Sequence, residues 1–252
     1  MIRDTDRDWT KIAEDNPYWG VLSAEKFRGR ELSAENRAEF FKSGEEYIAD
    51  VLKFVAQHLS KDFKIRRGLD FGCGVGRLLI PLARVSQEAV GIDIAPRMLE
   101  LTRENLAQEG LTNASVVLGD DAFSRVKGKF NFVNSFIVIQ HIPPERGMEI
   151  IEHLVRRLEI GGVFALQLTF AKTREFFIHE QGRASYYRRD GDVIHDLLPK
   201  KNAPPEGSVR MFDYDLNAVF LLLSPFCGQL LLVTPTNHGG HFGVRIVGVR
   251  CH

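Results

Sequence analysis

The sequence has few of the features that mark secreted, metal-binding or membrane proteins. Its three cysteines, Cys73, Cys227 and Cys251, lie far apart and form no Cys-x-x-Cys pair. This pattern predicts a reduced protein without a zinc site. The N-terminus is charged from its first residues and lacks the apolar stretch of a signal peptide, and no apolar run is long enough to cross a bilayer. We therefore expect a cytoplasmic protein with no membrane partner.

The chain also lacks net charge, because Lys and Arg together number 33 and so do Asp and Glu. Without an excess of positive charge, no nucleic-acid partner is expected. His238 and His241 flank two glycines, but no cluster of Cys, Asp or Glu accompanies them, so we expect no metal site. These properties leave the oligomeric state open.

What is present is enough apolar material for a substantial core. Hydrophobic residues make up 44% of the 252 residues, a size that fits one α/β domain plus additions. Residues 67–170 alternate between strand-like and helix-like segments. That alternation predicts a parallel sheet with helices on both faces.

Three glycines at alternate positions, Gly72, Gly74 and Gly76, follow a strand-like segment that ends near Asp70. An amphipathic segment at 77–84 comes directly after them, so the stretch predicts strand, tight turn and helix. Glycine accepts a positive φ and has no Cβ to keep a ligand away from the backbone. A helix behind the turn would point free N–H groups and the positive end of its dipole at the turn. We therefore expect a negatively charged group to bind there.

Two cofactor classes use such a turn. The dinucleotide fingerprint, G-x-G-x-x-G, needs its third glycine one position after Gly76, where this chain has Arg77. Residues 69–77, Leu-Asp-Phe-Gly-Cys-Gly-Val-Gly-Arg, resemble the first motif of class I S-adenosylmethionine-dependent methyltransferases. The resemblance implies that the turn wraps the methionine end of S-adenosylmethionine and that Asp70 helps to hold its amino group. A glycine-rich turn without a ligand is the alternative.

Acidic residues follow the next two predicted strands. Asp93 ends the strand at 88–92, about twenty residues beyond the turn, where a carboxylate can accept hydrogen bonds from both ribose hydroxyls of a nucleoside. Asp120 follows the strand at 114–118, and the resemblance implies that it meets the adenine amino group. We interpret the adjacent Asp121 mainly as a solvated loop carboxylate. The predicted cofactor-binding residues are Asp70, Gly72, Gly74, Gly76, Asp93, Ile94, Asp120, Asp121, Ala122 and Phe136.

A fourth strand is predicted at 130–139, and residues 130–142 resemble the fourth motif of the same family. The resemblance implies that the end of this strand faces the transferring methyl group. His141 is therefore the candidate catalytic residue, as a general base for an acceptor that carries a proton. The alternative is that His141 shapes the pocket or bonds to the backbone. His238 and His241 are weaker candidates.

Segments outside the alternating region suggest a lid and a cap. We expect a loosely held helix at 4–15 and two further helices at 31–41 and 45–59, the second capped by Ser43 with Glu46 completing a capping box. Phe123, after the third predicted strand, could contact adenine or belong to the core.

Near the C-terminus we expect a helix at 213–224 capped by Asp213, followed by strands at 229–234 and 242–249.

Residues 171–209 interrupt the alternation with basic residues and tyrosines, including Arg183, Arg188, Arg189, Lys200 and Lys201. A connection this long is usually functional or disordered. The resemblance implies a substrate cap, which could face an anionic or polyhydroxylated small molecule. A solvated insertion or an oligomer contact is an equal alternative.

Together these features predict an α/β fold with a seven-stranded, mostly parallel, doubly wound sheet whose last strand is antiparallel. Residues 1–66 would form a helical extension or lid, and residues 67–252 the methyltransferase domain with the inserted cap. The expected activity is methyl transfer from S-adenosylmethionine to an O, N or C nucleophile of a small molecule. The alternatives are a nicotinamide-dependent Rossmann oxidoreductase and a non-catalytic cofactor-binding protein of the methyltransferase fold.

Overall fold

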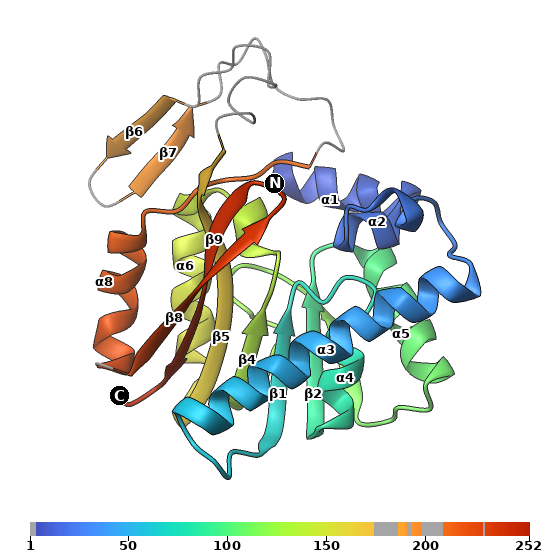
Figure 1. Ribbon diagram of the computed structural model, residues 1–252, viewed down its shortest axis with the longest axis horizontal. Coiled ribbons are helices and arrows are strands. Elements are labelled where there is room, and N and C mark those ends of the chain that lie inside the picture. The colour runs from blue at the N-terminus through green and yellow to red at the C-terminus, as the bar shows by residue number, and fades with distance from the viewer. Residues whose placement is uncertain (1–3, 174–185, 191–192, 198–208, 229) are drawn as a thin grey trace.

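The computed structural model describes residues 4–173, 186–190, 193–197, 209–228 and 230–252. Its main feature is a seven-stranded sheet with the order β3-β2-β1-β4-β5-β9-β8 (Figure 1). Strands β1 to β5 run parallel, whereas β9 is antiparallel to both β5 and β8. The predicted fold class, including its antiparallel last strand, is confirmed. The strands are β1 Ile65–Phe71, β2 Ser86–Asp93, β3 Ala114–Leu118, β4 Phe130–Ser135, β5 Leu158–Lys172, β8 Leu231–His238 and β9 His241–Val249.

Helices cover both faces of the sheet, and α3 runs across the strands in the view of Figure 1. Apolar side chains of α3, α4 and α5 form one cluster with residues of β1, β2, β4, β5 and β9, whereas those of α6 and α8 form a second cluster with other residues of the same strands. Because both faces are covered, the central strands are buried on both sides, and all six residues of β4 are buried. The helices are α1 Asp4–Asp15, α2 Pro17–Val21, η1 Glu25–Phe27, α3 Ala34–His58, α4 Leu79–Arg84, α5 Pro96–Gln108, η2 Ile139–His141, α6 Pro144–Arg156 and α8 Leu216–Cys227.

A separate two-stranded hairpin lies in the predicted cap. Its strands are β6 Tyr186–Asp190 and β7 Val193–Leu197, which pair antiparallel. Of the basic residues predicted to face a substrate, Arg188 and Arg189 belong to β6, and the others lie outside the described residues. None of the helices in the described part of the chain has the length and apolar character of a membrane span.

The prediction of two helices at 31–41 and 45–59 is wrong, because α3 is continuous. Ser33 caps it by accepting a hydrogen bond from Asn36 N at 3.2 Å, while Ser43 Oγ donates to the carbonyl of Phe40 inside the helix. A Cβ on Gly44 would lie 2.0 Å from the carbonyl oxygen of Arg77. This glycine therefore permits close packing of α3 on the glycine turn rather than breaking the helix.

Three further element predictions need correction. Helix α1 is well packed rather than loosely held, since Ile12 and Ala13 are buried. Strand β4 ends at Ser135, four residues early, because the apolar residues after it form a loop and η2. The cap of α8 is Asp215, which accepts from Asn217 N at 2.9 Å, and Asp213 instead pairs with Lys172 of β5.

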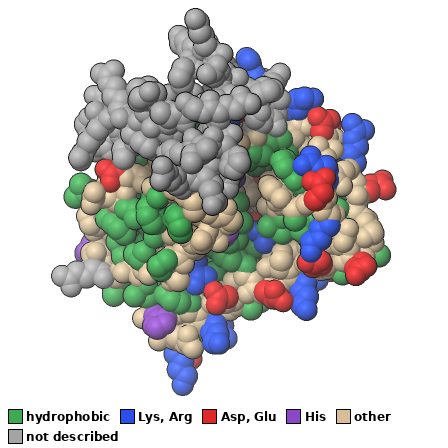
Figure 2. Space-filling view, turned by 45° about the horizontal axis from the view of Figure 1, so that its top comes forward, with side chains coloured by type: hydrophobic (Ala, Val, Ile, Leu, Met, Phe, Trp, Pro, Cys, Tyr) green, Lys and Arg blue, Asp and Glu red, His purple; other side chains and the backbone are tan. Residues whose placement is uncertain are grey.

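The surface carries both signs of charge. Figure 2 shows Lys and Arg side chains interspersed with Asp and Glu on the part of this face that is not grey. Exposed ion pairs occur in the described part of the chain, such as Arg28–Glu25 at 2.9 Å and Arg156–Glu152 at 2.7 Å. Exposed pairs of this kind add little to stability.

Candidate functional site

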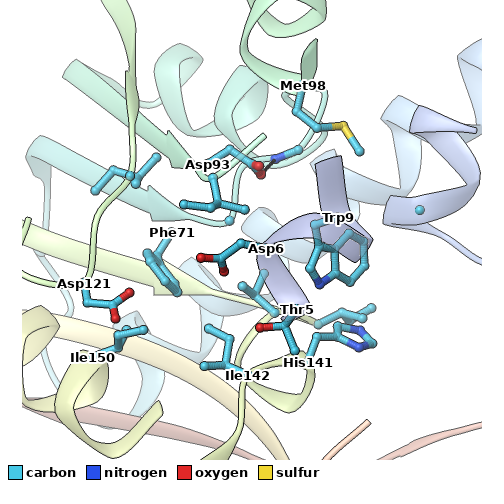
Figure 3. Close-up of a pocket in the computed structure, with 18 of the residues that line it drawn as sticks. Thr5, Asp6, Trp9, Phe71, Asp93, Met98, Asp121, His141, Ile142 and Ile150 are labelled. Atoms are coloured by element: carbon cyan, nitrogen blue, oxygen red, sulfur yellow. Dashed lines mark hydrogen bonds between the residues drawn. The ribbon is translucent and has the colours of Figure 1, made fainter. Parts of the chain in front are cut away.

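A cavity opens at the carboxyl ends of the parallel strands, where open α/β sheets bind their ligands (Figure 3). Its walls come from the ends of β1 and β2, the loops after β3 and β4, and the N-terminal helices α1 and α2. The described lining residues are Thr5, Asp6, Trp9, Gly20, Val21, Phe71, Gly72, Gly74, Ile92, Asp93, Ile94, Met98, Gly119, Asp120, Asp121, Phe136, Ile137, Val138, His141, Ile142, Arg146 and Ile150.

The glycine turn forms one wall, and its three glycines have φ values of +74°, +53° and +91°. A Cβ on Gly72 would lie 2.4 Å from the Val138 side chain, and one on Gly74 would lie 2.5 Å from that of Val21. Both positions therefore require glycine for conformation and for space. Gly76 is not part of the cavity wall; its Cβ would face Thr102 at 3.1 Å.

Asp93 braces this turn from the neighbouring strand. Its Oδ2 accepts from Gly74 N and its Oδ1 from Ala95 N, each at 2.9 Å. Burial raises the pKa of Asp93, and the backbone N–H groups oppose that shift. Because each carboxylate oxygen can accept more than one hydrogen bond, Asp93 can still receive ribose hydroxyls, as predicted. Ile94 lies beside it in the wall.

The two carboxylates after β3 differ in their surroundings. Asp120 accepts from Ser124 N at 2.9 Å and Ser124 Oγ at 2.6 Å, and these bonds lower its pKa. Asp121 receives Nε and Nη2 of Arg146 at 2.7–3.0 Å. The interpretation of Asp121 as a solvated loop carboxylate is therefore wrong. Its partner also donates to Asp6 of α1 at 2.5 Å, so Arg146 joins the lid to the loop after β3.

The other residues after β3 are less central to the cavity. Ala122 is exposed and does not contribute to the wall. Phe123 is 1% exposed and packs in the core, which agrees with the core alternative for it. Both facts leave Asp120 and Asp121 as the polar groups that this loop presents to a ligand.

His141 lies in the cavity wall at the end of η2, and its ring meets Trp9 of α1 edge-on with centroids 5.0 Å apart. Nδ1 is 2.7 Å from the carbonyl oxygen of Arg210. Since a carbonyl oxygen only accepts, Nδ1 carries the proton, and Nε2 faces the amide of Gln140 at 3.4 Å. Burial lowers the pKa of His141 to about 4. The ring is therefore neutral at pH 7 and weakly basic, and it makes the backbone bond considered as the alternative; general-base catalysis stays a prediction.

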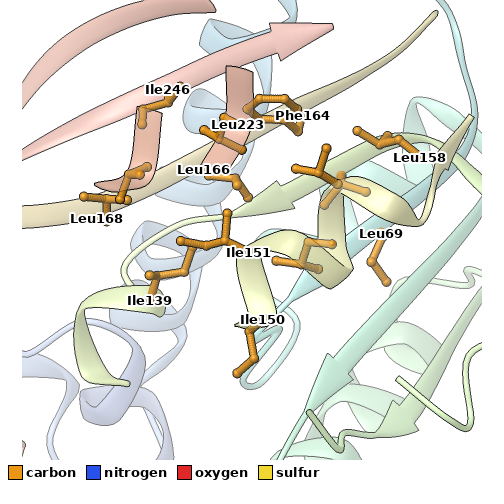
Figure 4. Packing of buried hydrophobic residues seen from close by; sticks show 14 of the residues in the cluster. Leu69, Ile139, Ile150, Ile151, Leu158, Phe164, Leu166, Leu168, Leu223 and Ile246 are labelled. Carbon is orange, nitrogen blue, oxygen red and sulfur yellow. The ribbon is translucent and has the colours of Figure 1, made fainter. Parts of the chain in front are cut away.

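The loop that carries His141 is anchored in the main core. Ile139 is fully buried and packs with Ile150 and Ile151 of α6 (Figure 4). Phe136, at the start of the loop, stacks on Tyr47 of α3 with centroids 4.0 Å apart and receives the edge of His238 at 5.4 Å. The structure thus brings together Phe136 and His238, which come from distant parts of the sequence.

Burial lowers the pKa values of both His238 and His241, to which Arg77 and Lys172 respectively contribute. Within the described ranges, no three His, Cys, Asp or Glu side chains come together as metal ligands do. Sequence reasoning missed Asp6, Trp9 and Arg146. The family resemblance implied a lid over the cofactor, but no local pattern marks which of its side chains enter the site.

Residues 69–162 match the family model described as methyltransferase domain. The chain is 28% identical, over 54% of its length, to the probable ribosomal RNA small subunit methyltransferase A of Methanosphaera stadtmanae. It is 30% identical, over 36% of its length, to the ubiquinone biosynthesis O-methyltransferase of Methylococcus capsulatus. These matches cover 50% and 38% of the two relatives, so the chain spans half or less of their length.

Solved structures with similar folds cover almost the whole chain. Magnesium protoporphyrin IX methyltransferase from Synechocystis PCC 6803, with bound SAH, has a TM-score of 0.60 at 18% identity, over 92% of this chain and 93% of that one. The N-methyltransferase NodS from Bradyrhizobium japonicum WM9, in complex with S-adenosyl-L-homocysteine, has a TM-score of 0.59 at 11% identity, over 99% and 100%. Residues 69–162 are therefore a methyltransferase domain, and the chain as a whole has the class I methyltransferase fold.

Proposed function

We propose that this protein is an S-adenosylmethionine-dependent methyltransferase that acts on an oxygen, nitrogen or carbon nucleophile of a small molecule. The observation that carries the proposal is the cavity wall itself. Gly72 and Gly74 of the turn, Asp93 after β2 and Asp120 after β3 line one continuous cavity. This is the order in which the methionine, ribose and adenine parts of the cofactor would be met.

The residues present fit this cofactor. The glycines allow its methionine end to approach the backbone, Asp93 can accept the ribose hydroxyls, and Asp120 and Asp121 offer acceptors for the adenine amino group. The apolar side chains of Phe71, Ile94, Met98 and Ile142 can cover the adenosine. The likeness to proteins solved with SAH supports the same assignment.

Methyl transfer requires little acid–base catalysis by the protein. The bound cofactor would supply a methyl group on a sulfonium, whose thioether is a good leaving group. The chain would align the acceptor and exclude water, which α1 does by closing over the cavity with Thr5, Asp6 and Trp9. His141, neutral at pH 7, could orient an acceptor if a hydroxyl of that acceptor replaced the Gln140 amide, 3.4 Å away, as the donor to Nε2. It would remove a proton only from an acceptor of low pKa.

A small-molecule acceptor is supported by the names of two similar proteins, a ubiquinone biosynthesis O-methyltransferase and a magnesium protoporphyrin IX methyltransferase. Other relatives are rRNA methyltransferases, but the mixed charges of this chain offer no basic surface for RNA on the described face of Figure 2. The segment 171–209 stays our candidate for the acceptor cap, and the free cysteines agree with a cytoplasmic protein.

Calorimetry of the full-length protein with S-adenosylhomocysteine and with NAD⁺ and NADH tests the cofactor. Binding of S-adenosylhomocysteine alone supports the proposal, whereas binding of the nicotinamide cofactors alone would favour the oxidoreductase alternative. Transfer of a labelled methyl group from S-adenosylmethionine to a panel of phenols, amines and carboxylic acids then tests catalysis. Tight cofactor binding with no transfer to any acceptor class would favour a non-catalytic protein.

A further inference from the structure

A segment that follows the insertion bridges the end of β5 and the loop after β4. We call residues 210–214 the strap; they form neither helix nor strand. Tyr214 N donates to the carbonyl of Thr169 at 2.8 Å, and Thr169 Oγ1 donates to the carbonyl of Phe212 at 2.9 Å. Phe212 N in turn donates to the carbonyl of Gln140 at 2.7 Å. The strap is therefore fixed on one side to the sheet and on the other to the loop after β4.

Tyr214 of the strap holds the backbone on either side of His141. The residue is 2% exposed. Its hydroxyl oxygen lies 3.0 Å from the carbonyl oxygen of Ile139 and 2.8 Å from that of Ile142. Because a hydroxyl has one proton and both carbonyls only accept, it donates to one of them at a time. Gly147 of α6 leaves the space for this hydroxyl, which a Cβ at that position would overlap.

Two independent contacts fix which ring nitrogen of His141 carries the proton. The carbonyl of Arg210, the first residue of the strap, accepts from Nδ1. From the other side, Ile137 N donates to Oε1 of Gln167, so the amide nitrogen of Gln167 faces Oε1 of Gln140 at 3.2 Å. The amide nitrogen of Gln140 therefore faces Nε2 of His141. Since an amide nitrogen only donates, Nε2 is the unprotonated nitrogen by this route as well.

The strap also reaches the lid. Nε of Arg210 lies 2.8 Å from Oδ2 of Asp8 in α1, and the Asp8 side chain is 3% exposed. Trp9, the next residue of α1, meets the ring of His141 edge-on. The ring is thus held by the strap, the lid and Gln140 together. The contact of Nε2 with Gln140 is the longest of these polar contacts, at 3.4 Å, and a donor on a bound acceptor can replace it.

We propose that the strap sets the acceptor class: it holds His141 as a hydrogen-bond acceptor, so the group that receives the methyl is a hydroxyl or a neutral amine and not a carboxylate, with Tyr214 as a positioning residue. This inference rests on the proposed function. A carboxylate has no proton to donate and would face the lone pair of Nε2. Among the described residues of the cavity wall, the cation that could attract a carboxylate is Arg146, which already binds Asp6 and Asp121. The proposal concerns the methylated group alone and leaves open any charge elsewhere on the acceptor.

A weak base is sufficient for such an acceptor. In the transfer, the acceptor oxygen or nitrogen bonds to the methyl carbon as the carbon–sulfur bond breaks, and the electron pair of that bond stays on sulfur. The proton of the acceptor becomes strongly acidic as its oxygen or nitrogen gains the methyl group. Nε2 of His141 can therefore take the proton during the transfer, although not before it, and water then removes it from the ring.

Nitrogen NMR of the full-length protein with ¹⁵N-labelled histidine reads the tautomer of His141 at pH 7, without cofactor or acceptor. We expect a proton on Nδ1 and none on Nε2, in the signal that is missing from His141→Phe. Tyr214→Phe frees the loop from the strap and should let the Nε2-protonated form appear. The matched control is Tyr18→Phe: Tyr18 is also buried, its hydroxyl accepts from Arg37 at 3.1 Å, and its loss should leave the tautomer unchanged.

Rates of methyl transfer to matched phenols, anilines and benzoic acids test the acceptor class. The wild type should have a kcat/KM at least about tenfold higher for phenols or anilines than for benzoic acids, because benzoates cannot donate to Nε2. Tyr214→Phe should lower kcat for the preferred class by about threefold to tenfold, the effect of one hydrogen bond. Its affinity for S-adenosylhomocysteine should not change, and Tyr18→Phe should keep the wild-type kcat.

A proton on Nε2 in the wild type, or the same tautomer change in Tyr214→Phe and Tyr18→Phe, would overturn the positioning role. Transfer to benzoic acids as fast as to phenols and anilines would overturn the acceptor class. If S-adenosylhomocysteine does not bind, or binds while no acceptor is methylated, the proposed function fails and the acceptor class fails with it. The tautomer, which is measured without any ligand, distinguishes that failure from a failure of the strap.

Discussion

Replacing Arg146 with methionine should detach the N-terminal lid from the body of the protein. Arg146 of α6 donates to Asp121 through Nε and Nη2, and to Asp6 and Thr5 of α1 through Nη1 at 2.5 and 3.3 Å. Methionine keeps the apolar stem and removes every one of these bonds. The two carboxylates then stay partly buried without their shared cation.

The size of the effect follows from the burial of the three side chains. Arg146, Asp6 and Asp121 are 13%, 18% and 23% exposed. Removing one partner of a fully buried pair costs about 3–5 kcal/mol, whereas an exposed pair contributes less than about 1 kcal/mol. We expect an intermediate loss of about 2–3 kcal/mol in the free energy of unfolding. For a chain of this size, that loss lowers Tm by roughly 4–12 °C.

Thermal unfolding of the variant, with and without S-adenosylhomocysteine, measures this loss. Affinity for S-adenosylhomocysteine should fall too, because Thr5, Asp6 and Trp9 of the lid line the cavity. The matched control is Arg156→Met on the same helix, whose side chain is 57% exposed and pairs with Glu152; its Tm should change by less than about 4 °C. An unchanged Tm in the Arg146 variant, or equal shifts in both, would refute the reasoning.

The remaining predictions concern the turn and its acids. Gly74→Val should abolish cofactor binding. The control is Gly110→Val, at a residue with φ +66° and open space around it, which should lower the stability only. Normal cofactor binding by Gly74→Val in calorimetry would show that the ligand does not approach the turn closely. Asp93→Ala should lower the affinity for S-adenosylhomocysteine at least about tenfold. An unchanged affinity would mean that Asp93 only holds the backbone of the turn and does not contact the ligand. Burial raises the pKa of Asp70 to about 7, and the charged groups that face it are Arg77 and Asp93. If Asp70 holds the ammonium group of S-adenosylhomocysteine in its ionised form, that ligand should bind with full affinity above pH 7. The affinity for S-adenosylhomocysteine should fall by up to about tenfold per pH unit below that value. The reference is 5′-methylthioadenosine, which has no ammonium group, and an affinity ratio that stays constant from pH 8 to 5.5 would contradict the prediction.

The strand ends could be predicted from the sequence because their pattern is local. An acidic residue after a buried strand can be recognised from the residues next to it, and so can glycines at alternate positions before a helix. Asp93, Asp120 and the glycine turn therefore fall where the pattern indicates, and parallel pairing of β1, β2 and β3 brings them to one edge of the sheet. The general place of the cavity followed from the same rule.

Elements whose role depends on a distant neighbour were predicted less well. The break predicted between residues 41 and 45 includes Gly44, and only the contact with the carbonyl of Arg77 shows why the continuous α3 needs a glycine there. The apolar residues after Ser135 fit a strand as well as a loop. In the loop after β4, Ile137 has a positive φ and its N–H donates to Gln167, thirty residues away in the chain.

The polar contacts that shape the site lie at still longer range. Arg146 and Asp6 are separated by 140 residues, Tyr47 and Asn134 by 87, and Arg210 and His141 by 69. Two of these partners change the chemistry of a predicted residue: Arg146 also gives Asp121 a counter-charge, and the carbonyl of Arg210 holds His141 as a neutral, weak base. A motif can therefore indicate which side chains face a ligand, whereas their protonation depends on partners that only the folded chain brings together. For this reason the pH dependence of binding, more than the presence of the motif, tests whether Asp70 holds the ammonium group of the cofactor.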